Sequence, residues 1–226
     1  MLAYTSSANE GVILLHGLCR SKGSMEKLDT ALSAAGYCVE NVDYASRQAG
    51  VEALAEQVIS RALKSEKLKD CTRIHFITHS LGGILVRSYF ARHAEPRLGR
   101  VVMLAPPNQG SEVVDTLKTW FLFKIVNGPA GSELGTDSLS APKRLGPVYF
   151  ELGIIAGDRS INWINSYLIP GPDDGKVSVE STKVEGAKEH LLLHCTHPYI
   201  MKNKEAIAAC LNFIRMGGFT IHEHRF

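Results

Sequence analysis

Apolar residues occur along the chain in two patterns, short continuous runs and longer stretches with helical spacing. The short runs, which predict buried strands, are 11–16, 37–44, 73–79 and 100–107. The longer stretches, which predict helices, are 24–36, 51–65 and 81–93, the first with Ser24 as a possible cap and Gly36 as a stop signal. Continuously apolar strands that alternate with helices are typical of a parallel sheet covered on both faces.

The alternation is interrupted once and then resumes. Residues 110–147 combine an apolar, helix-like piece with a stretch rich in Gly, Pro and Ser, which indicates an insertion over the sheet. Residues 148–157 and 190–197 predict two further strands, and 203–219 predicts a closing helix. We therefore expect a single α/β domain over 1–226 with about six mostly parallel strands, and 110–147 as its cap or lid.

Composition and charge exclude several classes of protein. The chain has 226 residues, is 45% hydrophobic and carries a formal net charge of +2, so nothing indicates a nucleic-acid partner. No apolar run approaches the ~20 residues that a membrane span needs. The first residues lack the apolar core of a secretory signal, so we expect a cytoplasmic protein. Its five cysteines contain no CxxC pair and no histidine has metal spacing, so we expect reduced thiols, no metal and no cofactor.

The segment THSLGG, residues 78–83, joins a predicted strand to a predicted helix. A sharp turn at this junction projects a Ser side chain from the carboxyl edge of a sheet, beside a helix N-terminus that can hold an oxyanion. Ser80 is therefore the candidate nucleophile, with Gly82 at one of the two small positions and Thr78 in place of the other glycine. The alternative is a Ser turn without catalytic function.

A second segment with possible chemistry, LLHGLCRS (14–21), follows the first predicted strand. A His-Gly pair there allows the backbone to turn and direct an N–H group toward the site. We expect the N–H groups of Leu18 and Leu81 to form the oxyanion hole. We interpret His16 as a hydrogen-bonded structural residue rather than as the base.

A Ser nucleophile needs a His base and an acid that orients it, here expected from later strand ends. His197 lies just past the last predicted strand. His190 lies at its start, and we expect His194 inside it. Asp174 is the favoured acid. The alternative acids are Asp158, which lies closer to its strand, and Asp173.

These segments together resemble α/β-hydrolases of the bacterial lipase and esterase type. The resemblance rests on HGL, THSLGG, LAPPNQGSEVVD, DDGKVSVEST and the final THPYI, and covers residues 11 to about 215. It implies a compact α/β-hydrolase fold with a Ser80, Asp174 and His197 triad, in which the Asp-Gly-x-Val loop favours Asp174. Thr78 and the absence of two opening antiparallel strands depart from the family pattern.

The resemblance implies a carboxylic ester hydrolase that works through an acyl-enzyme, with a small ester or lipid as substrate. In the insertion, 117–126 is strongly apolar, and Trp120, Phe121 and Phe123 are candidate substrate-binding residues. This segment is either a fixed wall of an acyl pocket or a lid that touches a lipid interface without stable membrane insertion. We expect a preference for short- to medium-chain acyl groups. The alternatives are a thioesterase or acyltransferase with the same triad, or a ligand-binding homologue without turnover; the oligomeric state stays open.

Overall fold

Six parallel strands form one sheet through the middle of the molecule. The structure is a computed structural model, and it describes residues 9–117, 128–161, 166 and 169–219. The strands are β1 (Glu10–Leu15), β2 (Cys38–Val42), β3 (Arg73–His79), β4 (Leu98–Leu104), β5 (Leu152–Gly157) and β6 (Glu189–Leu193). They are arranged in the order β2-β1-β3-β4-β5-β6, and every neighbouring pair is parallel. The predicted α/β fold with about six parallel strands is confirmed.

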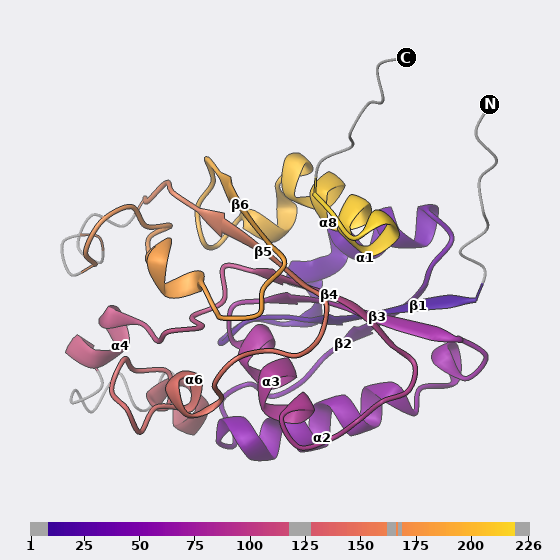
Figure 1. Ribbon diagram of the computed structural model, residues 1–226, viewed down its shortest axis with the longest axis horizontal. Helices are drawn as coiled ribbons and strands as arrows, with labels where there is room; N and C mark the ends of the chain where they lie inside the picture. The colour runs from indigo at the N-terminus through magenta and orange to yellow at the C-terminus, as the bar shows by residue number, and fades with distance from the viewer. Residues whose placement is uncertain (1–8, 118–127, 162–165, 167–168, 220–226) are drawn as a thin grey trace.

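Helices cover both faces of this sheet (Figure 1). The long helices are α1 (Glu26–Ala34), α2 (Val51–Leu63), α3 (Leu81–Phe90) and α8 (Lys204–Met216), and two short ones are α4 (Glu112–Leu117) and α6 (Ala141–Arg144). Single 3-10 turns are η1 (Lys22–Met25), η2 (Glu66–Leu68), η3 (Glu180–Thr182) and η4 (Ile200–Lys202). Helices α1 and α8 lie on one face, whereas α2 and α3 lie on the other.

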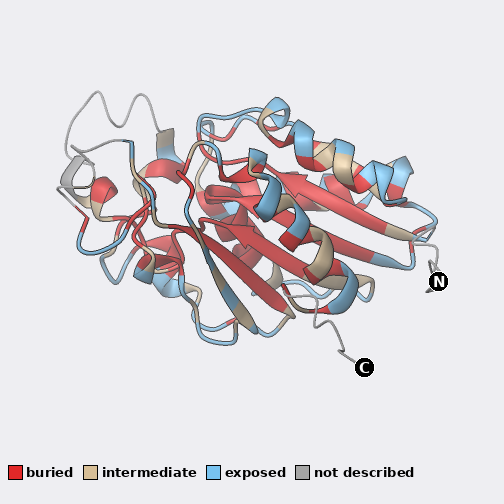
Figure 2. Ribbon diagram, turned by 90° about the horizontal axis from the view of Figure 1, so that it is seen from above, coloured by how far each residue is buried: buried red, intermediate tan, exposed pale blue. Residues whose placement is uncertain are grey.

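Two apolar cores result, one on each face of the sheet, and the central strands β1, β3, β4 and β5 are mostly buried between them (Figure 2). Successive side chains of a strand point to opposite faces, so neighbouring residues enter different cores. On β3, Phe76 packs into the core under α2 and α3, and Ile77 packs into the core under α1 and α8. This explains why the sequence runs are continuously apolar rather than alternating.

The last strand is shorter than the sequence predicts. The predicted strand covered 190–197, but β6 ends at Leu193, which pairs with Gly157, the last residue of β5. Since β6 is an edge strand with β5 as its one neighbour in the sheet, it has no strand to pair with beyond that residue. The expectation that His194 lies inside the strand is therefore wrong.

The first helix also differs from its prediction. Ser24 is not its cap, because the chain enters the helix through η1 and the Ser24 Oγ donates to the Ser21 carbonyl. The helix itself begins at Glu26.

The insertion at 110–147 lies between β4 and β5, and its short helices α4 and α6 lie beyond the carboxyl ends of the strands (Figure 1). The buried side chain of Arg87, on α3, binds both ends of the insertion. Its guanidinium donates to the Asn108 carbonyl at 2.9 Å and to the Gly146 carbonyl at 2.7 Å. A Glu133 carboxylate oxygen accepts from Val51 N–H at the start of α2, 3.0 Å away. Residues 118–127 of the apolar segment, with Trp120, Phe121 and Phe123, lie outside the described residues.

Candidate active site

Ser80 occupies a strained turn between β3 and α3. Its backbone has φ 50° and ψ −118°, a conformation that residues other than glycine rarely adopt. The turn is held by a hydrogen bond of 2.9 Å from Ser80 N–H to the Leu104 carbonyl at the end of β4. Strain of this kind persists only where surrounding structure imposes it, and here it holds the hydroxyl at the carboxyl edge of the sheet.

At Gly82, α3 passes close to the end of β1. A Cβ atom on Gly82 would lie 2.7 Å from the Leu15 carbonyl oxygen and 3.1 Å from that of His16. Thr78 is a regular residue of β3, opposite Leu15 and Met103, and is fully buried. Its threonine side chain is accommodated because the tight approach falls at Gly82 instead.

His197 and Asp174 form a buried pair from two different loops. His197 Nδ1 lies 2.7 Å from Asp174 Oδ2, and the two residues are 5% and 1% exposed. A carboxylate can only accept, so the proton of the neutral imidazole is on Nδ1 and Nε2 carries the lone pair. The backbones are joined as well, because His197 N–H donates to the Asp174 carbonyl at 2.8 Å.

The loop of Asp174 orients its carboxylate. Asp174 Oδ1 accepts from the N–H groups of Lys176 at 3.0 Å and Val177 at 2.9 Å. One oxygen is therefore held by the backbone while the other faces His197. Such an arrangement fixes the direction of the imidazole ring.

His79 connects this pair to the Ser80 turn. Its Nε2 lies 3.1 Å from the His197 carbonyl oxygen, and the two rings are 4.8 Å apart between centroids. Burial, followed by the charges of His197, Arg20 and Lys176, lowers the pKa of His79 well below 6.5. His79 is therefore a neutral donor to the loop that carries His197.

The alternative acids and bases have other partners. Asp158 lies 2.9 Å from Nδ1 of His194, whose side chain is 75% exposed. Asp173 accepts from the Ser166 hydroxyl and from Gly175 N–H. His190 donates to the Thr182 hydroxyl at 2.7 Å. The structure thus brings His197 and Asp174 together at the turn and separates the other candidates into local contacts.

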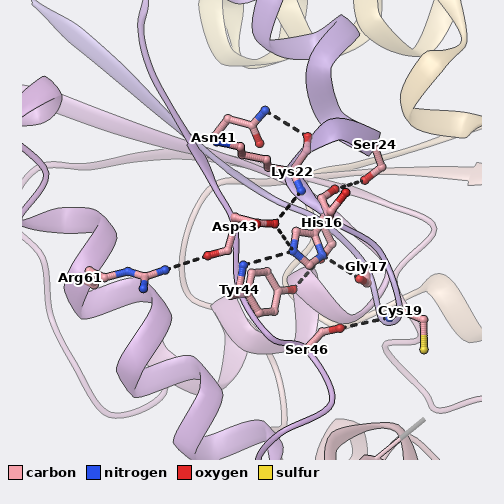
Figure 3. A network of polar contacts seen from close by, with 11 residues as sticks. His16, Gly17, Cys19, Lys22, Ser24, Asn41, Asp43, Tyr44, Ser46 and Arg61 are labelled. Atoms are coloured by element: carbon pink, nitrogen blue, oxygen red, sulfur yellow. Dashed lines mark hydrogen bonds and ion pairs between the residues drawn. The ribbon is translucent and has the colours of Figure 1, made fainter. Parts of the chain in front are cut away.

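A network from the loop after β2 supports the loop after β1 (Figure 3). The His16 ring stacks on Tyr44 with centroids 4.1 Å apart, and its Nδ1 donates to the Gly17 carbonyl at 2.8 Å. The Tyr44 hydroxyl donates to the His16 carbonyl at 2.5 Å, and the Ser46 hydroxyl accepts from Cys19 N–H at 3.1 Å. Burial lowers the pKa of His16, which agrees with a neutral structural residue.

The loop lies directly against the Ser80 turn. A Cβ atom on Gly17 would lie 2.7 Å from His79 Nδ1 and 3.2 Å from Ser80 Cβ. Leu18, the next residue, is buried, as is Leu81, the first residue of α3. The two candidate oxyanion donors therefore belong to backbone segments that border Ser80.

Sequence reasoning missed His79, Tyr44 and Ser46 as supporting residues. Tyr44 and Ser46 follow the carboxyl end of β2, and polar residues at that edge of a parallel sheet were an available signal. His79 gave no such signal, because it reads as the last residue of a buried strand.

The residues that the structure describes contain no group of three or more His, Cys, Asp or Glu side chains that could hold a metal ion. No helix among them is long and apolar enough to cross a membrane.

The fold is shared with solved lipases and esterases. Bacillus licheniformis lipase BlEst2 in its mature form is 18% identical, with a TM-score of 0.72 over 95% of this chain and 93% of that one. The metagenomic carboxyl esterase MGS0156 is 19% identical, with a TM-score of 0.69 over 86% of this chain and 66% of that one. A structure reported for the metagenome-derived lipolytic enzymes LipS and LipT is 18% identical, with a TM-score of 0.64 over 93% of this chain and 95% of that one.

These neighbours confirm the expected α/β-hydrolase fold. A comparison with curated proteins finds no match. The sequence model for palmitoyl protein thioesterases matches residues 11–142, more than half of the 226-residue chain. That region contains β1 to β4, the Ser80 turn and the loop of Leu18, and on this evidence the chain belongs to the palmitoyl protein thioesterase family.

Proposed function

We propose that this protein is a serine hydrolase of carboxylic esters or thioesters that acts through an acyl-enzyme on Ser80. The observation that carries the proposal is the buried contact of 2.7 Å between His197 and Asp174, tied through His79 to a strained serine turn. A structural serine turn does not need a buried His-Asp pair beside it. The shared fold and family support the same class of reaction.

In the proposed reaction, Ser80 Oγ attacks the carbonyl carbon while His197 Nε2 takes the hydroxyl proton. Asp174 stabilises the imidazolium that forms. The N–H groups of Leu18 and Leu81 bind the oxyanion of the tetrahedral intermediate. The imidazolium then protonates the leaving alcohol or thiol, and water activated by the same histidine releases the acid from Ser80.

The test is the substitution Ser80→Ala. We expect the variant to fold normally and to lose about 10³-fold or more of kcat on p-nitrophenyl butyrate, since the nucleophile is absent. A fluorophosphonate probe should label the unaltered protein at Ser80. A folded variant with near-normal turnover would overturn the assignment, and an unaltered protein that neither reacts with the probe nor hydrolyses the ester would favour a ligand-binding homologue.

A thioesterase is the second candidate, and the family match over 11–142 favours it specifically. The same residues serve both reactions, since only the leaving group differs. Rates on an oxygen ester and a thioester of one acyl group, each corrected for its uncatalysed rate, would separate the two. Transfer to an added alcohol at the expense of hydrolysis would indicate an acyltransferase.

For the acyl group we propose a preference for short to medium chains. Each methylene buried in an apolar pocket adds about 0.8 kcal/mol, so kcat/KM should rise about fourfold per methylene until the pocket is full. A pocket in a domain of this size should be filled by a short or medium acyl chain. Rates on p-nitrophenyl acetate, butyrate, octanoate and palmitate test this. A maximum at palmitate, with a jump at a lipid interface, would instead indicate a mobile lid in 110–147 and a long-chain substrate.

A further inference from the structure

Two polar side chains in the loop after β4 are buried, although neither belongs to the candidate triad. Asn108 is fully buried and Ser111 is 3% exposed. Their loop leaves the sheet beside the Ser80 turn, because Leu104, at the end of β4, accepts the hydrogen bond from Ser80 N–H. Buried polar groups need hydrogen-bond partners, and both side chains donate to the segment that carries Asp174.

Ser111 is joined to the acid through a single peptide group. The Ser111 Oγ donates to the Lys176 carbonyl at 3.0 Å. That carbonyl and the N–H of Val177 belong to the same planar peptide, and this N–H donates to Asp174 Oδ1 at 2.9 Å. A rotation of the peptide would break both hydrogen bonds. Ser111 therefore restrains one of the two N–H groups that fix the direction of the Asp174 carboxylate.

Asn108 joins the same segment to the helix that follows Ser80. Its Nδ2 donates to the Thr182 carbonyl at 2.8 Å, and its Oδ1 accepts from the Arg87 guanidinium at 3.1 Å. Arg87 lies on α3, about two helical turns after Ser80. The orientation of the amide is fixed, because its oxygen faces a cation and its nitrogen faces a carbonyl. Asn108 thus connects the nucleophile helix to the segment after Asp174.

The segment between these two contacts is folded on itself. Asp174 N–H donates to the Val177 carbonyl at 3.2 Å, and Asp173 forms an antiparallel bridge with Ser178. The second arm continues through η3 to Thr182. The acid loop is therefore held by one buried side chain close to Asp174 and by another at its far end. A shift at either contact would move the acid.

We propose that Ser111 and Asn108 are positioning residues, which hold the Asp174 loop against the Ser80 helix and keep the acid directed at His197. The proposal rests on the proposed function and deepens it by naming the residues that set the geometry of the triad. Buried polar networks suit this role, since they rigidify the segments that they join. Ser111 lies in the predicted cap, 110–147, so the start of that insertion would serve the acid rather than the acyl chain.

The first test is Ser111→Ala. We expect kcat on p-nitrophenyl butyrate to fall about tenfold while KM changes less than about twofold, because the acid loses its alignment. Ser111→Thr keeps a hydroxyl and should recover part of the rate. Ser132→Ala is the matched control, since the Ser132 hydroxyl donates to a carbonyl within the insertion, that of Gly128 at 3.2 Å. A Ser111→Ala protein that melts at a lower temperature but retains normal kcat would overturn the role of Ser111.

The second test is Asn108→Asp, which nearly preserves the shape of the side chain. The carboxylate can still accept from Arg87, but it replaces the donor to the Thr182 carbonyl with a second acceptor. We expect a fall of about tenfold in kcat. Asn203→Asp is the control, since Asn203 Oδ1 only accepts, from two N–H groups at the start of α8. Normal kcat in Asn108→Asp would mean that Asn108 serves Arg87 alone, and would overturn its positioning role.

An NMR measurement separates this proposal from the proposed function. In protein labelled with ¹⁵N-histidine, the Nδ1 resonance of His197, identified by its absence from His197→Ala, reports the contact with Asp174. It should shift in Ser111→Ala and Asn108→Asp and stay unchanged in Ser132→Ala. If no ester is hydrolysed but the resonance responds in this way, the hydrolase proposal fails while the positioning role stands. If the ester is hydrolysed but neither kcat nor the resonance changes in the two variants, the positioning role alone is overturned.

Discussion

The ring of His79 and the backbone of His197 are joined by a hydrogen bond of 3.1 Å, although the residues are 118 positions apart. The acceptor is a carbonyl, so His79 must donate from Nε2. His79 directly precedes Ser80, and this contact therefore ties the turn of the proposed nucleophile to the loop of the proposed base. A shift in either segment would strain the other.

His79→Phe should lower kcat on p-nitrophenyl butyrate by about tenfold while KM changes little, because the loop of His197 loses one hydrogen bond and its fixed position. His79→Gln should recover part of the rate, since its amide can donate where Nε2 does. Thermal melts check that both variants fold. Equal loss in both variants, with KM raised instead of kcat lowered, would contradict a positioning role.

Asp174→Asn should reduce kcat by roughly 10²- to 10⁴-fold, because the imidazolium at His197 loses the charge that stabilises it. Asp158→Asn is the matched control, since Asp158 also contacts a histidine, at 2.9 Å from His194. It should leave kcat within about twofold, as expected for a solvent-exposed contact. Steady-state rates of the two variants decide the assignment, and the reverse ranking would transfer the acid role to Asp158.

His197→Ala should be as damaging as Ser80→Ala, and the double variant should be little worse than either single one, because residues that act as a unit do not add. His194→Ala, which removes a 75% exposed side chain, should be mild. Single-turnover rates of the four proteins provide the measurement. Losses that multiply in the double variant would mean that Ser80 and His197 act separately.

Gly17→Ala should disturb the site directly, since its Cβ atom would lie 2.7 Å from His79 Nδ1 and 3.2 Å from Ser80 Cβ. We expect a loss of about tenfold or more in kcat as the loop or the turn shifts. Gly23→Ala lies in the same connection, and its Cβ would meet one atom only, Ser21 Oγ at 3.7 Å, so it should retain activity. Wild-type rates for Gly17→Ala would show that the loop after β1 adapts freely.

Acidification should destabilise the protein well above the pH at which carboxylates titrate. The pKa values of His16, His75 and His79 are lowered from 6.5, in each case mainly by burial. Below about pH 6.5 the unfolded chain therefore binds more protons than the native state, so stability falls as pH falls. Each fully buried histidine contributes up to about 1.4 kcal/mol per pH unit.

Urea denaturation at about pH 7.5, 6.5 and 5.5 measures this dependence. Glu56, Glu95 and Glu151 also have lowered pKa values, but their ordinary value is 4.5, so their contribution is lost at lower pH. A free energy of unfolding that stays constant from pH 7.5 to 5.5 would show that the three histidines titrate normally.

Much of the fold follows from local patterns in the sequence. Continuous apolar runs mark β1, β3, β4 and β5 because these central strands are buried on both faces, and helical spacing marks the helices between them. The Ser80 turn was also visible, since a serine with glycines after it at a strand-helix junction is a local feature. The position of His197 just beyond the last strand follows from the order of elements in the same way.

The contacts of the site were decided by tertiary structure. His194 and His197 are three residues apart, and sequence spacing alone does not say which one faces inward. The register of β6 on β5 ends the strand at Leu193, so that His194 is exposed beside Asp158 and His197 lies buried against Asp174. The roles of His79, Tyr44 and Ser46 likewise join segments far apart in the chain. Such contacts depend on how strands are ordered and registered, and no local pattern encodes the distance between two side chains on different strand ends.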